Sequence, residues 1–176
     1  MRVAVKVGST LLQDPRAMPD IVKDVCDLMD RDHQVVIVSS GAIDRGRSYL
    51  DIADGLDLDK QMLAAVGQPM LMQRYIELFY NWQVGSRYVC SQHLLTSEDF
   101  RDPRQQITRD VILGLIDKHV VPIINENDVV TVEELNAEFS ENDQLVRLVA
   151  ELVDADTVVF CTDKPGILED PDTEDS

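Results

Sequence analysis

The segment Lys6-Val7-Gly8-Ser9-Thr10 places a cation inside an apolar run, with a glycine and two small hydroxyl residues at its end. Backbone amides and hydroxyls beside an ammonium group are suited to binding phosphate. The spacing does not match the GxxxxGK[ST] loop of many nucleotide-binding proteins. A simple strand-to-loop turn explains the same residues, but a lysine in a mainly apolar strand needs a partner or a ligand, because an unpaired buried charge is costly.

Polar residues also follow three later apolar runs. Ser39-Ser40-Gly41 either lets the backbone approach an anion at the start of a helix or simply caps that helix. Asn125-Glu126-Asn127-Asp128 could hold an ammonium group, support a metal–phosphate site, or form an Asn/Asp turn. A second Asn-Asp pair, Asn142-Asp143, comes soon afterwards, and Thr162-Asp163 follows the last apolar run. Two such pairs suggest a polar site.

Apolar runs and amphipathic stretches alternate along the chain. These patterns predict strands at Arg2–Val7, Val35–Val38, Ser86–Leu95, Val120–Ile124 and Thr157–Cys161. They predict helices at Pro19–Asp32, directly after Gly41, at Asp59–Trp82 with a kink or break at Gly67-Gln68-Pro69, at Pro103–His119 and at Ser140–Leu152. In the helix at Pro103–His119, one apolar face is expected from Ile107, Val111, Ile112, Leu115 and Ile116.

This alternation predicts βαβ units, and therefore an α/β fold: a three-layer αβα sandwich with a mainly parallel sheet. In such sheets, ligands bind beyond the carboxyl ends of the strands. We therefore expect the polar clusters to converge on one crevice. The clusters are Gly8-Ser9-Thr10, Ser39-Ser40-Gly41, Asn125–Asp128 and Thr162-Asp163.

Composition excludes several classes of function. The 176 residues fit one domain, and 33 acidic against 16 basic side chains give a formal net charge of −17, which disfavours nucleic-acid binding. The longest apolar stretches, about five to seven residues, are too short for a membrane span. The N-terminal sequence lacks the long apolar core and the small-residue cleavage site of a secretory signal peptide. Cys26, Cys90 and Cys161 form no CxxC pair, which favours free thiols in a reducing cytoplasm over a zinc site or a disulfide.

Taken together, an ordered set of segments resembles the amino acid kinase family, and within it the glutamate 5-kinases. The set covers almost the whole chain in the family's order, which makes it specific. The segments are VKVGSTLL (Val5–Leu12), VIVSSGAIDRG (Val36–Gly46), MLAAVGQ (Met62–Gln68), SQHLLTSEDF (Ser91–Phe100), VPIINENDVVTVEE (Val121–Glu134), FSENDQL (Phe139–Leu145) and ADTVVFCTDKPGIL (Ala155–Leu168).

The resemblance implies which residues would bind the nucleotide. Lys6, Gly8 and Ser9 would bind the phosphates of ATP, and Thr162 and Asp163 would line the nucleotide pocket. Mg²⁺ would be held mainly by the phosphates, so no residue is expected to be a metal ligand.

The resemblance also implies an amino-acid side. Ser40, Gly41, Asp128 and Asn142 would bind L-glutamate, with Asp128 facing the substrate ammonium group.

The implied reaction transfers the γ-phosphoryl group of ATP to the side-chain carboxylate of L-glutamate, as the first step of proline biosynthesis. Lys6 and Asp143 would be the catalytic residues, with Asp143 orienting the lysine. A carboxylate is already nucleophilic at neutral pH, so the reaction needs no general base. The family also implies a homo-oligomer and feedback inhibition by proline.

The sequence departs from the family in two respects. Ser140-Glu141 stands where Gly-Asp is usual, and a Gly-Thr-Gly-Gly-Met-type loop with a second phosphate-binding lysine is missing. Residues 1–168 are therefore expected to be an amino acid kinase domain with an incomplete nucleotide-binding part, and residues 169–176 an acidic tail. The alternative function is a catalytically impaired chain that binds glutamate or proline, or that assembles with an intact kinase.

Overall fold

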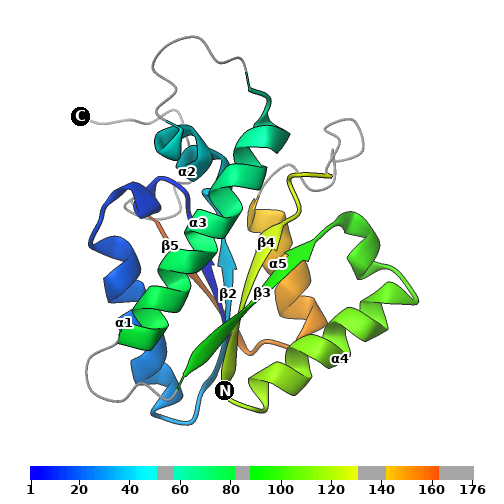
Figure 1. Cartoon of the computed structure of the whole chain (residues 1–176). Coiled ribbons are helices and arrows are strands. Elements are labelled where there is room, and N and C mark those ends of the chain that lie inside the picture. The colour runs from blue at the N-terminus through cyan, green and yellow to red at the C-terminus, as the bar shows by residue number, and fades with distance from the viewer. Residues whose placement is uncertain (51–57, 82–87, 131–141, 163–176) are drawn as a thin grey trace, which may run out of the picture.

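A sheet of five parallel strands forms the centre of the computed structural model, which describes residues 1–50, 58–81, 88–130 and 142–162. The spatial order is β3-β4-β2-β1-β5, and every neighbouring pair is parallel. All carboxyl ends therefore meet at one edge (Figure 1). The strands are β1 (Arg2–Val7), β2 (Gln34–Ser39), β3 (Val89–Leu95), β4 (Val120–Glu126) and β5 (Thr157–Cys161).

Helices cover both faces of the sheet, so the three-layer αβα architecture is confirmed. In Figure 1, α1 (Ala17–Met29) and α3 (Lys60–Asn81) lie on one face, and α4 (Arg104–Ile116) and α5 (Asn142–Leu152) lie on the other. The short helix α2 (Ala42–Tyr49) lies at the carboxyl edge of the sheet. Among the described residues, no helix is long and apolar enough to cross a membrane.

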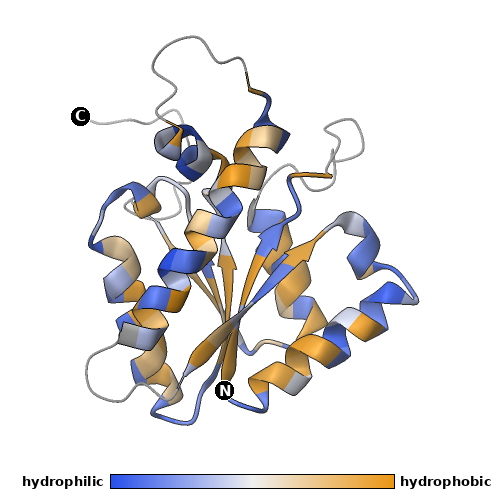
Figure 2. Cartoon of the chain, in the orientation of Figure 1, coloured by the Kyte–Doolittle hydropathy of each residue, from blue (hydrophilic) through white to orange (hydrophobic). Residues whose placement is uncertain are grey.

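The strands read as continuous apolar runs because they are buried on both faces. Val3, Val5 and Val7 of β1 pack into the core beneath α1 and α3, whereas Ala4 packs into the core beneath α4 and α5. Figure 2 shows this apolar centre in orange. By the same alternation, Lys6 lies on the α5 side of β1. The fold thus places this lysine beside the start of α5.

Helix α3 runs without interruption through Pro69, so a break at Gly67-Gln68-Pro69 is wrong, whereas the alternative of a kink there stays a prediction. A proline normally disturbs a helix because it has no N–H group and its ring crowds the preceding turn. Here, tertiary packing supports the helix on both sides of the proline. Leu71, Tyr75 and Phe79 are buried against the sheet, and Gly67 contacts α2 directly.

Helix α4 buries only part of the predicted apolar face. Ile112 and Ile116 are buried, but Ile107 and Val111 are exposed, so the prediction is wrong for the latter pair. Residues 107 and 111 form one stripe along the helix, and 112 and 116 form another about 140° away around the helix axis. The sequence pattern shows both stripes, but only the second packs on the sheet.

All three cysteines are free thiols, as the sequence predicts. Cys26 is buried in the core beneath α1, whereas Cys90 and Cys161 are half-buried. Burial raises the pKa of the Cys90 thiol to about 11 and also raises the pKa of Cys161. Both groups are therefore protonated at neutral pH.

Candidate active site at the carboxyl edge of the sheet

A cleft of about 390 Å³ opens at the carboxyl edge, beside the start of α2. Three of the four predicted polar clusters contribute to its wall, so their convergence is confirmed for those three. The polar and small residues that line the cleft are Ser9, Ser40, Gly41, Asp44, Arg47, Lys60, Asn125, Glu126 and Asp128.

The fourth cluster lies at the same edge but does not line this cleft in the described structure. The N–H group of Gly8 donates a hydrogen bond of 3.3 Å to the carbonyl oxygen of Cys161. Thr162 therefore follows directly beside the end of β1, and its side chain is exposed. Asp163 lies outside the described residues.

Gly41 forms the turn between β2 and α2. Its φ of 92° is in the left-handed region, where glycine is favoured. It occupies the N-cap position of α2, and no side chain caps this helix. The Ser39 hydroxyl instead lies 3.0 Å from the Tyr75 hydroxyl, and Ser40 is buried. The segment therefore does cap α2, as the alternative interpretation expects, but through Gly41 and not through a serine side chain.

Lys6 and Asp143 form an ion pair across the edge of the sheet, with 2.9 Å between Nζ and Oδ1. The Lys6 side chain is only 18% exposed, which explains why it needs a partner within a mainly apolar strand. A Cβ on Gly8 would lie 3.8 Å from the Lys6 ammonium nitrogen, so this ammonium group lies beside Gly8. Asn142 is the first residue of α5, and its backbone is therefore next to this pair.

Asp128 is a half-buried carboxylate on the wall of the cleft. Within the described part of the chain, it makes no hydrogen bond or ion pair. Burial raises the pKa of Asp128 above its usual value because the charged form loses hydration. A cation entering the cleft would relieve this penalty, so Asp128 is well placed to bind an ammonium group.

Sequence reasoning missed the charged residues Asp44, Arg47 and Lys60 in the cleft. Asp44 and Arg47 lie three residues apart on α2, with 3.5 Å between carboxylate and guanidinium. The sequence signal for this pair was the charged segment Asp44–Arg47, which begins three positions after Gly41, because a helix that starts at the cleft places its first turns beside it.

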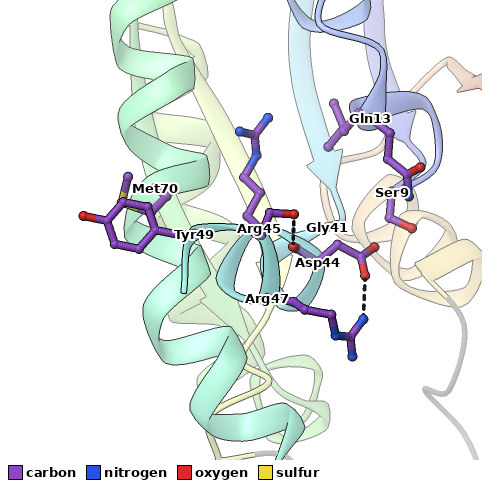
Figure 3. Close-up of a pocket in the computed structure, with 10 residues that line it drawn as sticks. Ser9, Gln13, Gly41, Asp44, Arg45, Arg47, Tyr49 and Met70 are labelled. Atoms are coloured by element: carbon purple, nitrogen blue, oxygen red, sulfur yellow. Dashed lines mark hydrogen bonds and ion pairs between the residues drawn. The ribbon is translucent and has the colours of Figure 1, made fainter. Parts of the chain in front are cut away.

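A second cavity, of about 730 Å³, adjoins the cleft and shares Ser9, Gly41, Asp44 and Arg47 with it. Figure 3 shows the Asp44–Arg47 pair on α2, with Ser9 and Gln13 contributed by the segment after β1. Arg45 extends away from the pair, and its Nη2 lies 3.1 Å from the sulfur of Met18. Partial burial lowers the pKa of Arg45.

The described residues contain no group of three or more histidine, cysteine, aspartate or glutamate side chains arranged to hold a metal ion. The polar groups at the edge are the Lys6–Asp143 pair, backbone at tight turns, and the charged side chains that line the cleft, which include the cations Arg47 and Lys60. This donor set suits an organic zwitterion and an anionic group side by side.

The fold is that of an α/β protein with a cleft at the carboxyl ends of parallel strands, which is where proteins of this class bind their ligands. The sequence profile described as the amino acid kinase family matches residues 1–176. The chain therefore belongs to the amino acid kinase family.

Several curated relatives are glutamate 5-kinases. The glutamate 5-kinase of Thermoanaerobacter sp. (strain X514) is 39% identical over 178 residues, which cover 96% of this chain and 46% of that protein. The glutamate 5-kinase of Dictyoglomus thermophilum is 40% identical over 97% of this chain and 47% of that protein. Glutamate 5-kinase 2 of Bacillus subtilis is 37% identical over 96% of this chain and 46% of that protein. The chain spans about half the length of these relatives.

Among solved structures, the carbamate kinase of Giardia superposes with a TM-score of 0.63 and 15% sequence identity. The match covers 93% of this chain and 72% of that one. At this identity, the likeness shows a shared fold.

Proposed function

We propose that this chain is the amino-acid-binding part, with the beginning of the nucleotide-binding part, of a glutamate 5-kinase. The complete enzyme would transfer the γ-phosphoryl group of ATP to the side-chain carboxylate of L-glutamate, forming L-glutamyl 5-phosphate for proline biosynthesis. The names of the relatives support this substrate. The observation that carries the proposal is a half-buried Asp128 in a cleft at the same sheet edge as the Lys6–Asp143 pair.

Asp128 is the proposed partner of the substrate ammonium group. Ser40 and Gly41 line the same cleft, and the glycine, which has no side chain, would let the backbone approach the amino acid. Asn142 is proposed as a further contact because α5 starts at this edge. Electrostatic attraction would thus orient the α-amino group, while the side-chain carboxylate points toward the phosphate side.

Lys6 is the proposed phosphate-binding and catalytic residue, and Asp143 holds its ammonium group in place. Ser9 and Thr162 lie at the ends of the neighbouring strands, where nucleotide phosphates would be bound. The N–H of Gly8 already bonds to Cys161, so Gly8 would contribute through its missing side chain, which leaves room beside Lys6. Asp163 is proposed as a nucleotide contact from sequence alone.

ATP supplies the phosphoryl group, and Mg²⁺ held mainly by its phosphates would reduce their charge. The protein's own task is positioning and charge neutralisation, because direct phosphoryl transfer needs little covalent chemistry from the enzyme. Both reactants are anionic, so the Lys6 ammonium group offsets repulsion between them. The glutamate carboxylate is already ionised at neutral pH, so it would attack the γ-phosphorus of ATP, with ADP as the leaving group, without a general base.

A second candidate is a chain that binds glutamate or proline without turnover, or that assembles with an intact kinase. The observation behind it is that residues 1–176 contain the proposed amino-acid cleft but no Gly-Thr-Gly-Gly-Met-type loop. Homo-oligomer formation, proline inhibition and a cytoplasmic location are proposed from the family resemblance. So is the division into a kinase domain at 1–168 and an acidic tail at 169–176.

The test is hydroxamate formation that depends on both ATP and L-glutamate, with hydroxylamine trapping the acyl phosphate. Turnover that Lys6→Ala abolishes and Lys23→Ala leaves intact would support the kinase, because Lys23 is an exposed lysine on α1. Retained glutamate binding without turnover in the complete protein that contains these residues would select the second candidate. Absence of both turnover and glutamate binding would reject both.

A further inference from the structure

A buried polar contact joins α3 to the end of β4, beneath the floor of the cleft. The Asn125 side-chain amide donates a hydrogen bond of 2.9 Å from Nδ2 to Oε1 of Gln68. Both residues are almost fully buried, at 3% and 6% exposure. Two polar side chains withdrawn from water in this way require each other, because an unpaired buried amide is costly.

The backbone fixes the direction of this contact. Oδ1 of Asn125 accepts a hydrogen bond of 2.9 Å from the N–H group of Glu126. A backbone N–H group can only donate, so the oxygen of Asn125 must face it and the NH₂ group must face α3. Position 68 therefore has to supply an acceptor. Loss of that acceptor would leave the Asn125 NH₂ group unpaired and free the amide to reorient.

The preceding residue of α3 contacts the helix that begins at the cleft. A Cβ on Gly67 would lie 1.8 Å from the carbonyl oxygen of Ala42, so the start of α2 rests directly on the α3 backbone. Ala42 follows Ser40 and Gly41, and all three residues line the cleft. The end of β4 lines the cleft as well, through Asn125, Glu126 and the following Asp128. Adjacent residues of α3 thus contact two of the segments that line the cleft.

We propose that Gln68 is a positioning residue of the amino-acid cleft, which holds Asn125 so that the end of β4 presents Asp128 to the substrate ammonium group. The inference rests on the proposed function and adds a residue that does not itself line the cleft. Asn125 is correspondingly a structural link, since both ends of its side-chain amide are engaged inside the protein.

The experiment compares three variants of the chain by calorimetric titration with L-glutamate and by amide hydrogen exchange. Gln68→Met keeps the length of the side chain but removes the acceptor. Gln68→Glu keeps an acceptor oxygen. Gln73→Met is the matched control, because Gln73 is an exposed glutamine on the same helix that bonds only to Glu77 among the described contacts.

We expect Gln68→Met to weaken glutamate binding about tenfold and to speed hydrogen exchange of the Glu126 amide. Gln68→Glu should remain closer to the wild type in both quantities. Gln73→Met should leave both quantities unchanged. Unchanged glutamate affinity and unchanged Glu126 exchange in Gln68→Met would overturn the inference. A fall in thermal stability with no selective change at Glu126 would also overturn it, because a merely structural role predicts that result.

The two measurements separate this inference from the proposed function. If the wild-type chain binds no glutamate, the proposed function fails, and the Glu126 exchange rate still decides whether Gln68 holds the Asn125 amide.

Discussion

The ammonium nitrogen of Lys6 lies 2.9 Å from a carboxylate oxygen of Asp143, and this contact joins β1 to the first turn of α5. Asp143 is 58% exposed, so the pair lies at the rim of the protein rather than in its core. Partly exposed ion pairs contribute little to stability, about 1 kcal/mol or less. The pair therefore serves mainly to hold the Lys6 ammonium group at the edge of the sheet where phosphate is proposed to bind.

Replacing Lys6 by methionine should weaken ATP binding about tenfold or more, because one charge-assisted contact to phosphate is lost. Glutamate affinity should change less than about twofold, and the free energy of unfolding by about 1 kcal/mol or less. Titration calorimetry and urea denaturation measure these quantities, with Lys23→Met as the exposed-lysine control. Equal losses of ATP and glutamate affinity would contradict the separate roles of Lys6 and Asp128.

Asp128→Asn should weaken glutamate binding by about tenfold or more while making the ligand-free protein more stable at neutral pH. Burial raises the pKa of Asp128, so the folded state holds this proton more tightly than the unfolded state. Ionisation of Asp128 therefore destabilises the fold as pH rises above its ordinary value of 3.8. The penalty is complete above the raised pKa, and asparagine does not have it.

Urea denaturation at about pH 7 and about pH 4 checks this sign. The stability gain of Asp128→Asn over the wild type should be larger at the higher pH. A variant that is less stable than the wild type at neutral pH would show that Asp128 has a favourable partner in the free protein.

Gly67→Ala should destabilise the protein by about 3 kcal/mol or more, because its Cβ would lie 1.8 Å from the Ala42 carbonyl oxygen. Gly114→Ala is the matched control on α4, where a Cβ meets nothing within 4 Å. This control should raise the free energy of unfolding by up to about 1 kcal/mol, because alanine favours helix more than glycine does. Similar effects of the two substitutions in urea denaturation would disprove the direct contact between α2 and α3.

The thiol of Cys90 should react slowly with iodoacetamide in the folded protein. Its pKa of about 11 leaves very little thiolate near neutral pH, and the thiolate is the reactive form. Mass spectrometry after alkylation at about pH 8 should show Cys90 largely unmodified, whereas the chain unfolded in urea should be modified completely. Equal rates in the folded and unfolded chains would contradict the burial of this group.

The sheet and the meeting of polar clusters could be predicted from sequence because both follow from local rules. Buried parallel strands read as apolar runs, and their carboxyl ends necessarily share one edge. The continuity of α3 could not be predicted, because Pro69 is a local signal for a break and the packing that overrides it comes from distant residues. On α4, the sequence shows two apolar stripes, and nothing in the local pattern indicates which of them is buried.

The location of the site could be predicted from the sequence, but the separate role of each residue in it could not. Lys6 was expected to have a partner, and the structure provides Asp143. Asn125 was grouped with possible ligands, but its side chain is engaged by Gln68, which lies 57 positions away in the sequence. A hydrogen bond across such a separation leaves no local pattern. The charges of Asp44, Arg47 and Lys60 belong to the cleft only because α2 and α3 pack at the end of the sheet.

Nuclear magnetic resonance titration of the isotope-labelled chain with L-glutamate tests the central claim most directly. We predict that the largest changes in amide chemical shift occur at Ser40, Gly41 and the Glu126–Asp128 segment, and that these changes are lost in Asp128→Asn. Shifts confined to another part of the molecule, such as the exposed face of α4 around Ile107, or no shifts at all, would contradict it.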